Sequence, residues 1–235
     1  APVQAEDFYQ WVVEDNFAGE RPNWDIVNGV TFVDDVTKYE NMKLRLLNGS
    51  HTALSYISSL TYQDQDMNVT VDKVMLDEDI VQFVSKYMND VRPTLNGGPE
   101  GEAHLDEYCD SLLQRFSNKD ISDQVSRLCQ DGSKKFQGFV VPPLKEMLVN
   151  GQDVSMIQKV IASWYVYLSG EWKGNIDDPA GEELIQLAKR NELKQFVNVG
   201  IGDFVSDTFI IEIENEVNVL RKHGPREFLR SINVL

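Results

Sequence analysis

The amino-acid sequence predicts a mainly α-helical protein with a small β element at its front. Residues 1–35 are rich in aromatic, β-branched and turn residues, which is typical of short strands joined by loops. From about residue 36 onward, apolar residues recur at spacings of three and four, which marks one buried face of a helix. This change of period divides the chain into a boundary segment, 1–35, and a helical domain, 36–235.

Each part of the chain has its own expected elements. Strands are expected over 8–13 and 30–33, and they either pair with each other or join a sheet elsewhere. The first long helix is expected over 36–60, although Gly49 interrupts it. A glycine inside a helix costs roughly 1 kcal/mol relative to alanine, so Gly49 indicates the close approach of another backbone or of a ligand. Further helices are expected over 77–91, 102–116, 122–136, 144–148, 155–168, 178–190, 207–222 and 225–232.

Two of these helices carry a more specific expectation. The segment 155–168 is strongly apolar, and we expect it at the centre of the core. Gly224 lies between the last two helices and is expected to end the first of them as a C-cap.

Composition limits the classes of function. The formal net charge of the 235 residues is -16, which disfavours nucleic acid and anionic membrane surfaces as partners. No apolar run reaches the roughly 18 residues of a membrane span, and the first residues lack the pattern of a signal peptide. Two cysteines, Cys109 and Cys129, are expected as free thiols, and no Cys/His spacing indicates a metal site. We therefore expect a cytoplasmic protein without a metal.

The run from Lys43 to His51 carries the clearest chemical pattern. It places Lys43, Asn48 and His51 in the arrangement K-x4-N-x2-H. At about 100° per residue, a regular helix puts these three side chains, Glu40 and Leu47 on one broad face. If that face lines a cleft, its apolar neighbours partly desolvate the lysine.

Such a face suits proton transfer at an alcohol or a carbonyl. Desolvation lowers the pKa of a lysine, which makes Lys43 a candidate general base. The Asn48 amide is able to donate to a developing alkoxide, and His51 to bond a neighbouring hydroxyl. Glu40, one turn earlier, is placed to relay protons to solvent. Spacing alone leaves open an ordinary solvated helix with none of these roles.

A second cluster of cations lies in the expected helix 122–136. Arg127 and Lys135 are eight residues apart, so a regular helix places them within about 80° of each other. Together they suit a polyhydroxylated or anionic substrate. The alternative is surface salt bridging with Asp123 and Asp131.

Several motifs together resemble the long-chain mannitol dehydrogenase family. They are the run 10–17, Arg21-Pro22, Asp34-Asp35-Val36 and the run 43–51, in the family's order, and the likeness is clearest over 11–145. The resemblance implies a multi-helical C-terminal domain similar to that of 6-phosphogluconate dehydrogenase. It also implies roles without any metal: Lys43 as general base, Asn48 at the oxyanion, His51 on substrate hydroxyls and Glu40 on the proton path.

The resemblance further implies a substrate, a cofactor and a second domain. Arg127 and Lys135 match the family's substrate contacts, and the substrate is a polyol or ketose. Family members bind NAD or NADP mainly through an N-terminal Rossmann domain, which we do not find in residues 1–235. That domain is the expected partner, with residues 1–35 at the boundary to it. The sequence leaves the choice between NAD and NADP open.

Three functions follow as hypotheses. The first is a polyol 2-dehydrogenase of the mannitol-to-fructose type. The second is a hexuronate reductase acting on fructuronate or tagaturonate, for which Arg127, Lys134 and Lys135 would bind the substrate carboxylate. The third is a non-catalytic helical binding module, in which Lys43 and His51 face solvent or a partner instead of a shared cleft.

Overall fold

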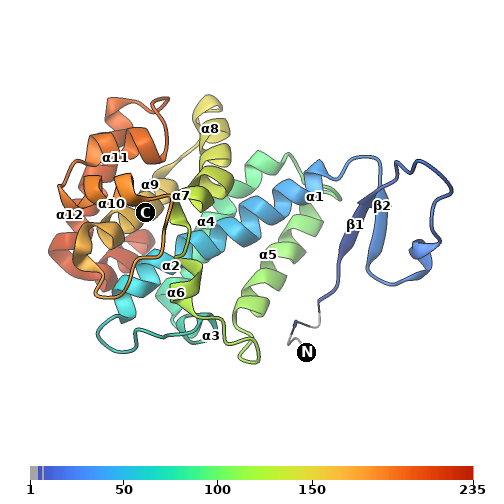
Figure 1. Cartoon of the computed structure of the whole chain (residues 1–235), viewed down its shortest axis with the longest axis horizontal. Helices are drawn as coiled ribbons and strands as arrows, with labels where there is room; N and C mark the ends of the chain where they lie inside the picture. Colours follow the sequence, from blue (N-terminus) through green and yellow to red (C-terminus); the bar gives the residue numbers. More distant parts are fainter. Residues whose placement is uncertain (1–4, 7, 235) are drawn as a thin grey trace.

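The computed structural model describes residues 5–6 and 8–234, and it shows a helical body with a small β unit beside it (Figure 1). The β unit contains the strands β1 (Trp11–Glu14) and β2 (Val30–Val33) and a short 3-10 helix, Trp24–Ile26. The strands pair in parallel, from Trp11 opposite Val30 to Glu14 opposite Val33. The expected strand at 30–33 is confirmed, and the one expected at 8–13 begins three residues later.

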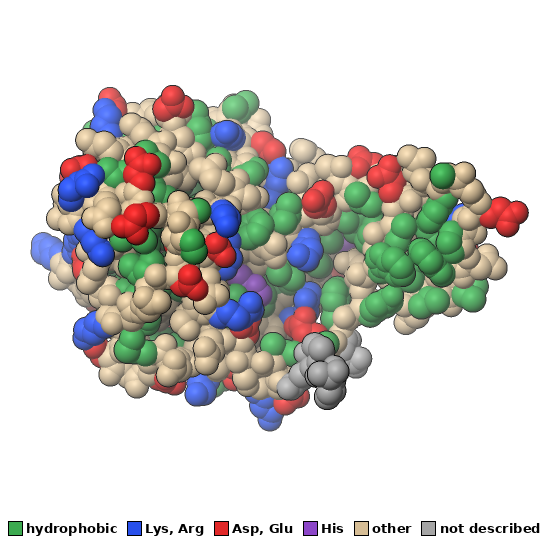
Figure 2. Space-filling view, in the orientation of Figure 1, with side chains coloured by type: hydrophobic (Ala, Val, Ile, Leu, Met, Phe, Trp, Pro, Cys, Tyr) green, Lys and Arg blue, Asp and Glu red, His purple; other side chains and the backbone are tan. Residues whose placement is uncertain are grey.

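The β unit leaves much of its apolar surface uncovered. Trp11 stacks on Trp24 with ring centroids 4.9 Å apart, yet both rings remain exposed, and Ile26 is 81% exposed. Figure 2 shows hydrophobic side chains gathered over this unit, apart from the helical body. Parallel sheets normally have both faces covered, so this surface is unusual for a finished fold.

The body is built from helices that follow one another along the chain. They are α1 (Thr37–Met42), α2 (Gly49–Tyr62), α3 (Val71–Val74), α4 (Glu78–Val91), α5 (Glu102–Phe116), α6 (Val125–Leu128), α7 (Gly132–Lys135), α8 (Val141–Val149), α9 (Ser155–Val166), α10 (Glu182–Lys189), α11 (Leu193–Gly200) and α12 (Asp207–Arg230). Three π-helical segments, η2 (Lys43–Asn48), η4 (Phe136–Val140) and η5 (Tyr167–Glu171), and two short 3-10 helices, η3 (Arg92–Leu95) and η6 (Ser231–Val234), complete it.

Helix α9 lies at the centre of the core, as its composition predicts. Its side chains from Met156 to Val166 are all buried, and it packs against α12 and α2. Trp164 stacks on Phe136 at 3.9 Å between ring centroids, which joins α9 to the start of η4. Helix α12 bends at Gly224, where φ is 79°, so the expected break between the last two helices is confirmed at this residue.

The first long helix runs without a gap from α1 through η2 into α2. Its middle, η2, is a π-helix: the Gly49 N–H donates to the Leu44 carbonyl five residues earlier. The expectation that another backbone or a ligand approaches Gly49 is wrong, because the group that approaches it closely is a side chain. A Cβ added at Gly49 would lie 2.4 Å from the Tyr87 hydroxyl oxygen.

The prediction of a single helix over 122–136 is wrong. Ser122 and Asp131 both have left-handed backbone angles, with φ of 48° and 52°, and the chain forms the separate short helices α6 and α7. The cause is a contact with a distant segment, because the backbone of Asp123 and Val125 hydrogen-bonds to that of Val71 and Val69. The apolar periodicity of one segment gives no information about its pairing with a distant segment.

Two helix starts also differ from expectation, and both have a local cause. Helix α8 begins at Val141, with Pro142 and Pro143 in its first turn, where proline is tolerated. Helix α10 begins at Glu182 instead of Asp178. The Asp178 carboxylate is engaged elsewhere, since it accepts hydrogen bonds from the Ser133 backbone and hydroxyl at 2.7 and 2.6 Å.

Candidate functional site

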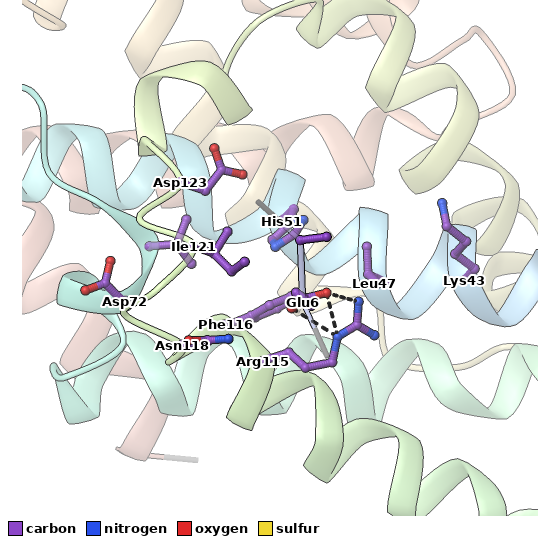
Figure 3. Close-up of a pocket in the computed structure, with 12 residues that line it drawn as sticks. Glu6, Lys43, Leu47, His51, Asp72, Arg115, Phe116, Asn118, Ile121 and Asp123 are labelled. Carbon is purple, nitrogen blue, oxygen red and sulfur yellow. Dashed lines mark hydrogen bonds and ion pairs between the residues drawn. The ribbon is translucent and has the colours of Figure 1, made fainter. Parts of the chain in front are cut away.

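A cavity of about 370 Å³ lies between the first long helix and helix α5. Figure 3 shows Lys43, Leu47 and His51 following one another along the first helix, opposite Arg115 and Phe116 of α5. The remaining walls come from α3, from the loop between α5 and α6 and from the N-terminal segment, namely Ala5, Glu6, Val71, Asp72, Asn118, Ile121 and Asp123. The cavity therefore joins segments that are far apart in the sequence.

Lys43 lies at the open side of this cavity. Its side chain is exposed and makes no ion pair with any residue that the structure describes. The desolvation expected from its apolar helix neighbours is therefore not present, and that part of the sequence interpretation is wrong. Glu40, one turn earlier, is exposed as well and does not line the cavity.

The π-helix changes where Asn48 lies relative to Lys43. In a regular α-helix, residues five apart point in different directions, about 140° from each other. In a π-helix the hydrogen bond joins residues five apart, so residue i+5 lies about one turn above residue i. Lys43 and Asn48 are the first and last residues of η2, and the π-helical geometry brings them closer to one face. The side-chain amide of Asn48 has no hydrogen-bond partner among residues 5–6 and 8–234.

Arg45 anchors this π-helix from its buried side. Its guanidinium donates two hydrogen bonds of 2.7 Å to the Glu146 carboxylate on α8 and one of 2.9 Å to the Thr94 carbonyl. A planar, bidentate pair of this kind fixes direction as well as distance. Arg45 thus holds the segment from Lys43 to Asn48 against two other helices.

His51 is packed into the inner wall of the cavity. Its ring stacks on Phe116 with centroids 4.2 Å apart. Burial lowers the pKa of His51 to about 4, while Asp123 and Glu6 act to raise it and Arg127 and Arg115 to lower it. At neutral pH the imidazole is therefore uncharged, so one ring nitrogen donates and the other accepts a hydrogen bond.

The low pKa of His51 predicts a pH-dependent stability. In the unfolded chain a histidine titrates near pH 6.5, whereas folded His51 stays neutral down to about pH 4. Between these values the unfolded state binds the extra proton, so the free energy of unfolding decreases as the pH falls from about 6.5 to 4. Urea unfolding of wild type and His51→Gln across this range measures the effect, which should be weaker in the variant. Protonation of His51 near pH 6.5 by NMR would contradict the prediction.

Arg127 and Lys135 belong to different short helices but stay close to the site. Arg127, on α6, is exposed and forms an ion pair with Asp123, whose side chain lines the cavity. Lys135, on α7, is half-buried and donates to the Leu128 carbonyl at 2.8 Å. Burial lowers the pKa of Lys135. The salt bridge with Asp123 that spacing left open is present, and the substrate contacts of both cations stay a prediction.

The sequence interpretation missed the far wall of the cavity. Arg115 forms a bidentate ion pair with Glu6, with its shortest N–O distance at 2.7 Å, and its guanidinium lies 4.1 Å from the centre of the Phe8 ring. Asp72, on α3, has a buried carboxylate oxygen with no hydrogen-bond partner among the described residues. No local spacing connects these three residues to the run 43–51, so no motif in a single sequence would have revealed them.

Comparison with known proteins identifies the family. The sequence profile described as the mannitol dehydrogenase C-terminal domain matches residues 35–203, well over half of the chain. The chain belongs to the mannitol dehydrogenase family. This confirms the resemblance that the sequence motifs indicate, and it extends the match beyond residue 145, where the motifs were clearest.

Curated mannitol dehydrogenase relatives match nearly all of this chain. Polyol:NADP oxidoreductase of Gluconobacter oxydans (strain 621H) is 36% identical over 227 residues, which cover 94% of this chain and 45% of that protein. Mannitol 2-dehydrogenase of Pyrenophora tritici-repentis (strain Pt-1C-BFP) is 35% identical over 237 residues, covering 95% and 40%. The chain therefore spans less than half the length of these relatives.

Solved structures of the mannitol dehydrogenase type share the fold. Pseudomonas fluorescens mannitol 2-dehydrogenase, in a ternary complex with NAD and D-mannitol, matches with a TM-score of 0.84 at 36% identity, covering 96% of this chain and 46% of that one. D-sorbitol dehydrogenase in substrate-free form matches with a TM-score of 0.83 at 30% identity, covering 95% and 46%. The mainly α fold class is confirmed. In the described part of the chain, no helix has the length and apolar character needed to cross a membrane.

Proposed function

We propose that this chain is the catalytic and substrate-binding part of an NAD(P)-dependent polyol 2-dehydrogenase that interconverts a polyol and its 2-ketose. One observation carries the proposal: Lys43 and His51, from the motif run of this family, line the same cavity. A non-catalytic module would leave them facing solvent or a partner separately. The names of the relatives, a polyol:NADP oxidoreductase and mannitol 2-dehydrogenases, support the same class of reaction.

Each motif residue has a proposed role, although only Lys43 and His51 line the cavity, and Asn48 and Glu40 do not. Lys43 carries a free amine at the open side of the cavity, from where it takes the proton of the C2 hydroxyl. Asn48 has a free amide one π turn away and donates to the oxyanion that forms. Neutral His51 bonds a neighbouring hydroxyl, because it is able both to donate and to accept. Exposed Glu40 passes the proton on to solvent.

Arg127 and Lys135 complete the substrate site in this proposal. Arg127 holds Asp123, and Asp123 faces the cavity, so a substrate hydroxyl placed between them meets a donor and an acceptor. The Lys135 amine donates to the Leu128 carbonyl at the end of α6 and is partly desolvated. Both residues then bind hydroxyls at the far end of the polyol from the reacting carbon.

The exposed side of Lys43 fits a nicotinamide ring. The exposed amine of Lys43, on a cavity that is also lined by the apolar side chains of Leu47 and Phe116, leaves room for a flat ring to cover both the amine and the substrate. Bound NAD or NADP supplies the hydride acceptor. The described residues offer no phosphate-binding loop, since the glycines at 200 and 202 end helix α11 and do not follow a strand. This chain therefore contributes the proton-transfer groups, and the nucleotide is held mainly by another part of the protein.

The β unit is the proposed attachment to that part. We assign residues 1–35 to the boundary with a Rossmann domain, because a two-stranded parallel sheet is not stable by itself and its apolar side chains are uncovered. When such a domain covers the cavity, it also removes water from Lys43. The apolar neighbours of Lys43 in its own helix do not provide this desolvation.

A substrate panel on the full-length protein tests the proposed function. With NAD and NADP added separately, we expect oxidation of at least one polyol and reduction of its 2-ketose, without added metal and in the presence of a chelator. Absorbance of the reduced nicotinamide measures the rate. Absence of turnover with every polyol and 2-ketose in the panel, or turnover of hexuronates alone, would contradict the proposal.

A further inference from the structure

The walls of the cavity carry more negative than positive groups. Two cations, Lys43 and Arg115, face three carboxylates, those of Glu6, Asp72 and Asp123. The ion pair of Arg127 with Asp123 brings the formal sum to zero. When Lys43 acts as a base it is neutral, so the working site has a net negative charge. A substrate that carries a negative charge of its own is repelled by such a site.

Apart from the proposed base Lys43, Arg115 is the cation among the described lining residues, and two of its three nitrogens already bind a carboxylate. Its guanidinium uses Nε and Nη2 in hydrogen bonds of 2.7 to 3.3 Å to both oxygens of Glu6, which is the geometry that a bound carboxylate would take. Figure 3 shows this pair at the lower wall of the cavity, near His51 and Leu47. Glu6 thus stands where the acid group of a uronate would be held.

The groups left free in the cavity suit hydroxyls. Nη1 of Arg115 is a buried donor without a partner, and Oδ1 of Asp72 is a buried acceptor without a partner, as far as the described residues show. A hydroxyl both donates and accepts, so a polyol is able to satisfy each of them with different hydroxyls. A carboxylate only accepts, so a uronate carboxylate at this point would pair with Arg115 but would be repelled by Asp72.

Building on the proposed polyol dehydrogenase function, we infer that Glu6 is a specificity-determining residue. By occupying the Arg115 guanidinium it keeps the site for neutral polyols and ketoses and rejects hexuronates. Asp72, on α3, acts in the same direction as a second carboxylate in the cavity wall.

The test compares the reduction of fructose with that of fructuronate by the full-length enzyme. Wild type should have the higher kcat/KM for fructose. In Glu6→Gln the ratio of kcat/KM for fructuronate over fructose should rise on the order of tenfold, because a charge-assisted pair to Arg115 becomes available. In the double variant with Arg115→Gln this gain should disappear, since the cation that provides it is gone.

A second variant and a control keep the test independent of folding. Asp72→Asn removes a carboxylate without an ion pair among the described residues, and it should raise the same ratio in the same direction. Glu102→Gln removes a carboxylate that pairs with Arg92 outside the cavity, and the ratio should stay at the wild-type value. Thermal unfolding confirms that each variant is folded.

The outcomes separate this inference from the function on which it rests. An unchanged ratio in both Glu6→Gln and Asp72→Asn, with fructose reduction retained, would overturn the specificity role and leave the dehydrogenase intact. A wild-type preference for fructuronate would overturn it as well. Absence of any ketose or hexuronate reduction by wild type would instead remove the proposed function.

Discussion

Replacing Lys43 by alanine should lower kcat of the full-length enzyme by about 10² to 10⁴, the range typical for losing a general base. Lys43 makes no ion pair within the described part of the chain, and it lies at the open side of the cavity. Its removal therefore takes away a proton acceptor without breaking a structural contact. KM should change little, because the hydroxyl contacts come from other residues.

The pH profile identifies the chemical role. A lysine base works as the neutral amine, so wild-type kcat should fall as the pH is lowered, and this dependence should flatten in Lys43→Ala. Lys38→Ala is the matched control, because Lys38 is an exposed lysine on the same helix, five residues earlier. Turnover of Lys43→Ala within tenfold of wild type at every pH would show that another group takes the proton.

Replacing Arg45 by alanine should lower the free energy of unfolding by about 3 kcal/mol, the upper end of the range for a hydrogen bond to a charged group. The Arg45 side chain is 9% exposed, whereas Glu146 is 43% exposed and regains water when its partner is lost. The Thr94 carbonyl also loses its donor. Urea unfolding, with the slope checked against wild type, measures the change.

The same substitution should also reduce kcat, because the π-helix that aligns Lys43 with Asn48 loses its anchor. In this variant, the rate of amide hydrogen exchange should increase more over residues 43–49 than in the other helices. A loss below about 1 kcal/mol would show that the helix core alone holds the π-helical turn.

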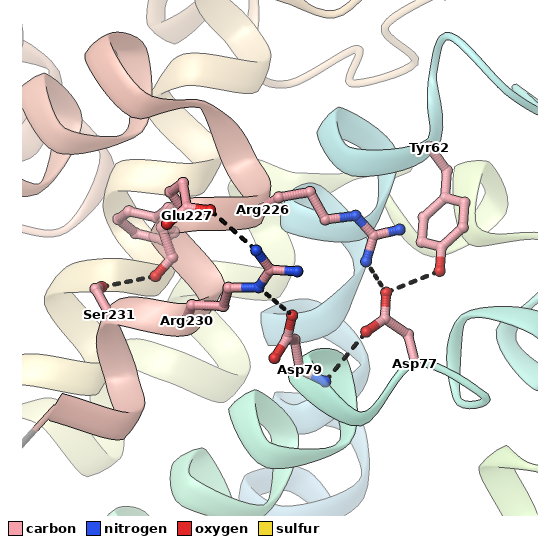
Figure 4. Close-up of polar contacts among 8 residues, drawn as sticks. Tyr62, Asp77, Asp79, Arg226, Glu227, Arg230 and Ser231 are labelled. Atoms are coloured by element: carbon pink, nitrogen blue, oxygen red, sulfur yellow. Dashed lines mark hydrogen bonds and ion pairs between the residues drawn. The ribbon is translucent and has the colours of Figure 1, made fainter.

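Arg226 provides the comparison for Arg45. It also joins distant segments, since it bonds the Asp77 carboxylate at the start of α4 (Figure 4). Its side chain is 38% exposed, however, and Asp77, which is only 12% exposed, keeps hydrogen bonds from the Tyr62 hydroxyl and the Asp79 backbone. Arg226→Ala should therefore cost about 1 kcal/mol or less. An equal loss in both variants would mean that burial does not distinguish the two pairs.

The parts of the structure that depend on one segment could be predicted from the sequence. The central helix α9, the strand at Val30–Val33 and the break at Gly224 each follow from apolar period, β-branched residues or backbone freedom. The same holds for the candidate site, where Lys43, Asn48 and His51 lie within nine residues of one helix. Their roles remain predictions.

The parts that depend on contacts between segments could not be predicted. The pairing of residues 69–71 with 123–125 divides an expected helix into α6 and α7, and nothing in either segment indicates the other. The exposure of Lys43 depends on what covers the cavity and not on its neighbours in the helix. The contact that we propose as the anchor of the π-helix likewise joins Arg45 to Glu146, 101 residues away.

The uncovered β unit has a consequence for handling the isolated 235-residue chain. Within the described residues, β1 and β2 pair only with each other, so each strand presents one free edge of backbone N–H and C=O groups. Free edges are templates for strand addition by another molecule, and exposed rings such as Trp11 add to that tendency. The net charge of -16 opposes self-association by repulsion, and salt screens this repulsion. We therefore expect self-association of the isolated chain to increase with ionic strength.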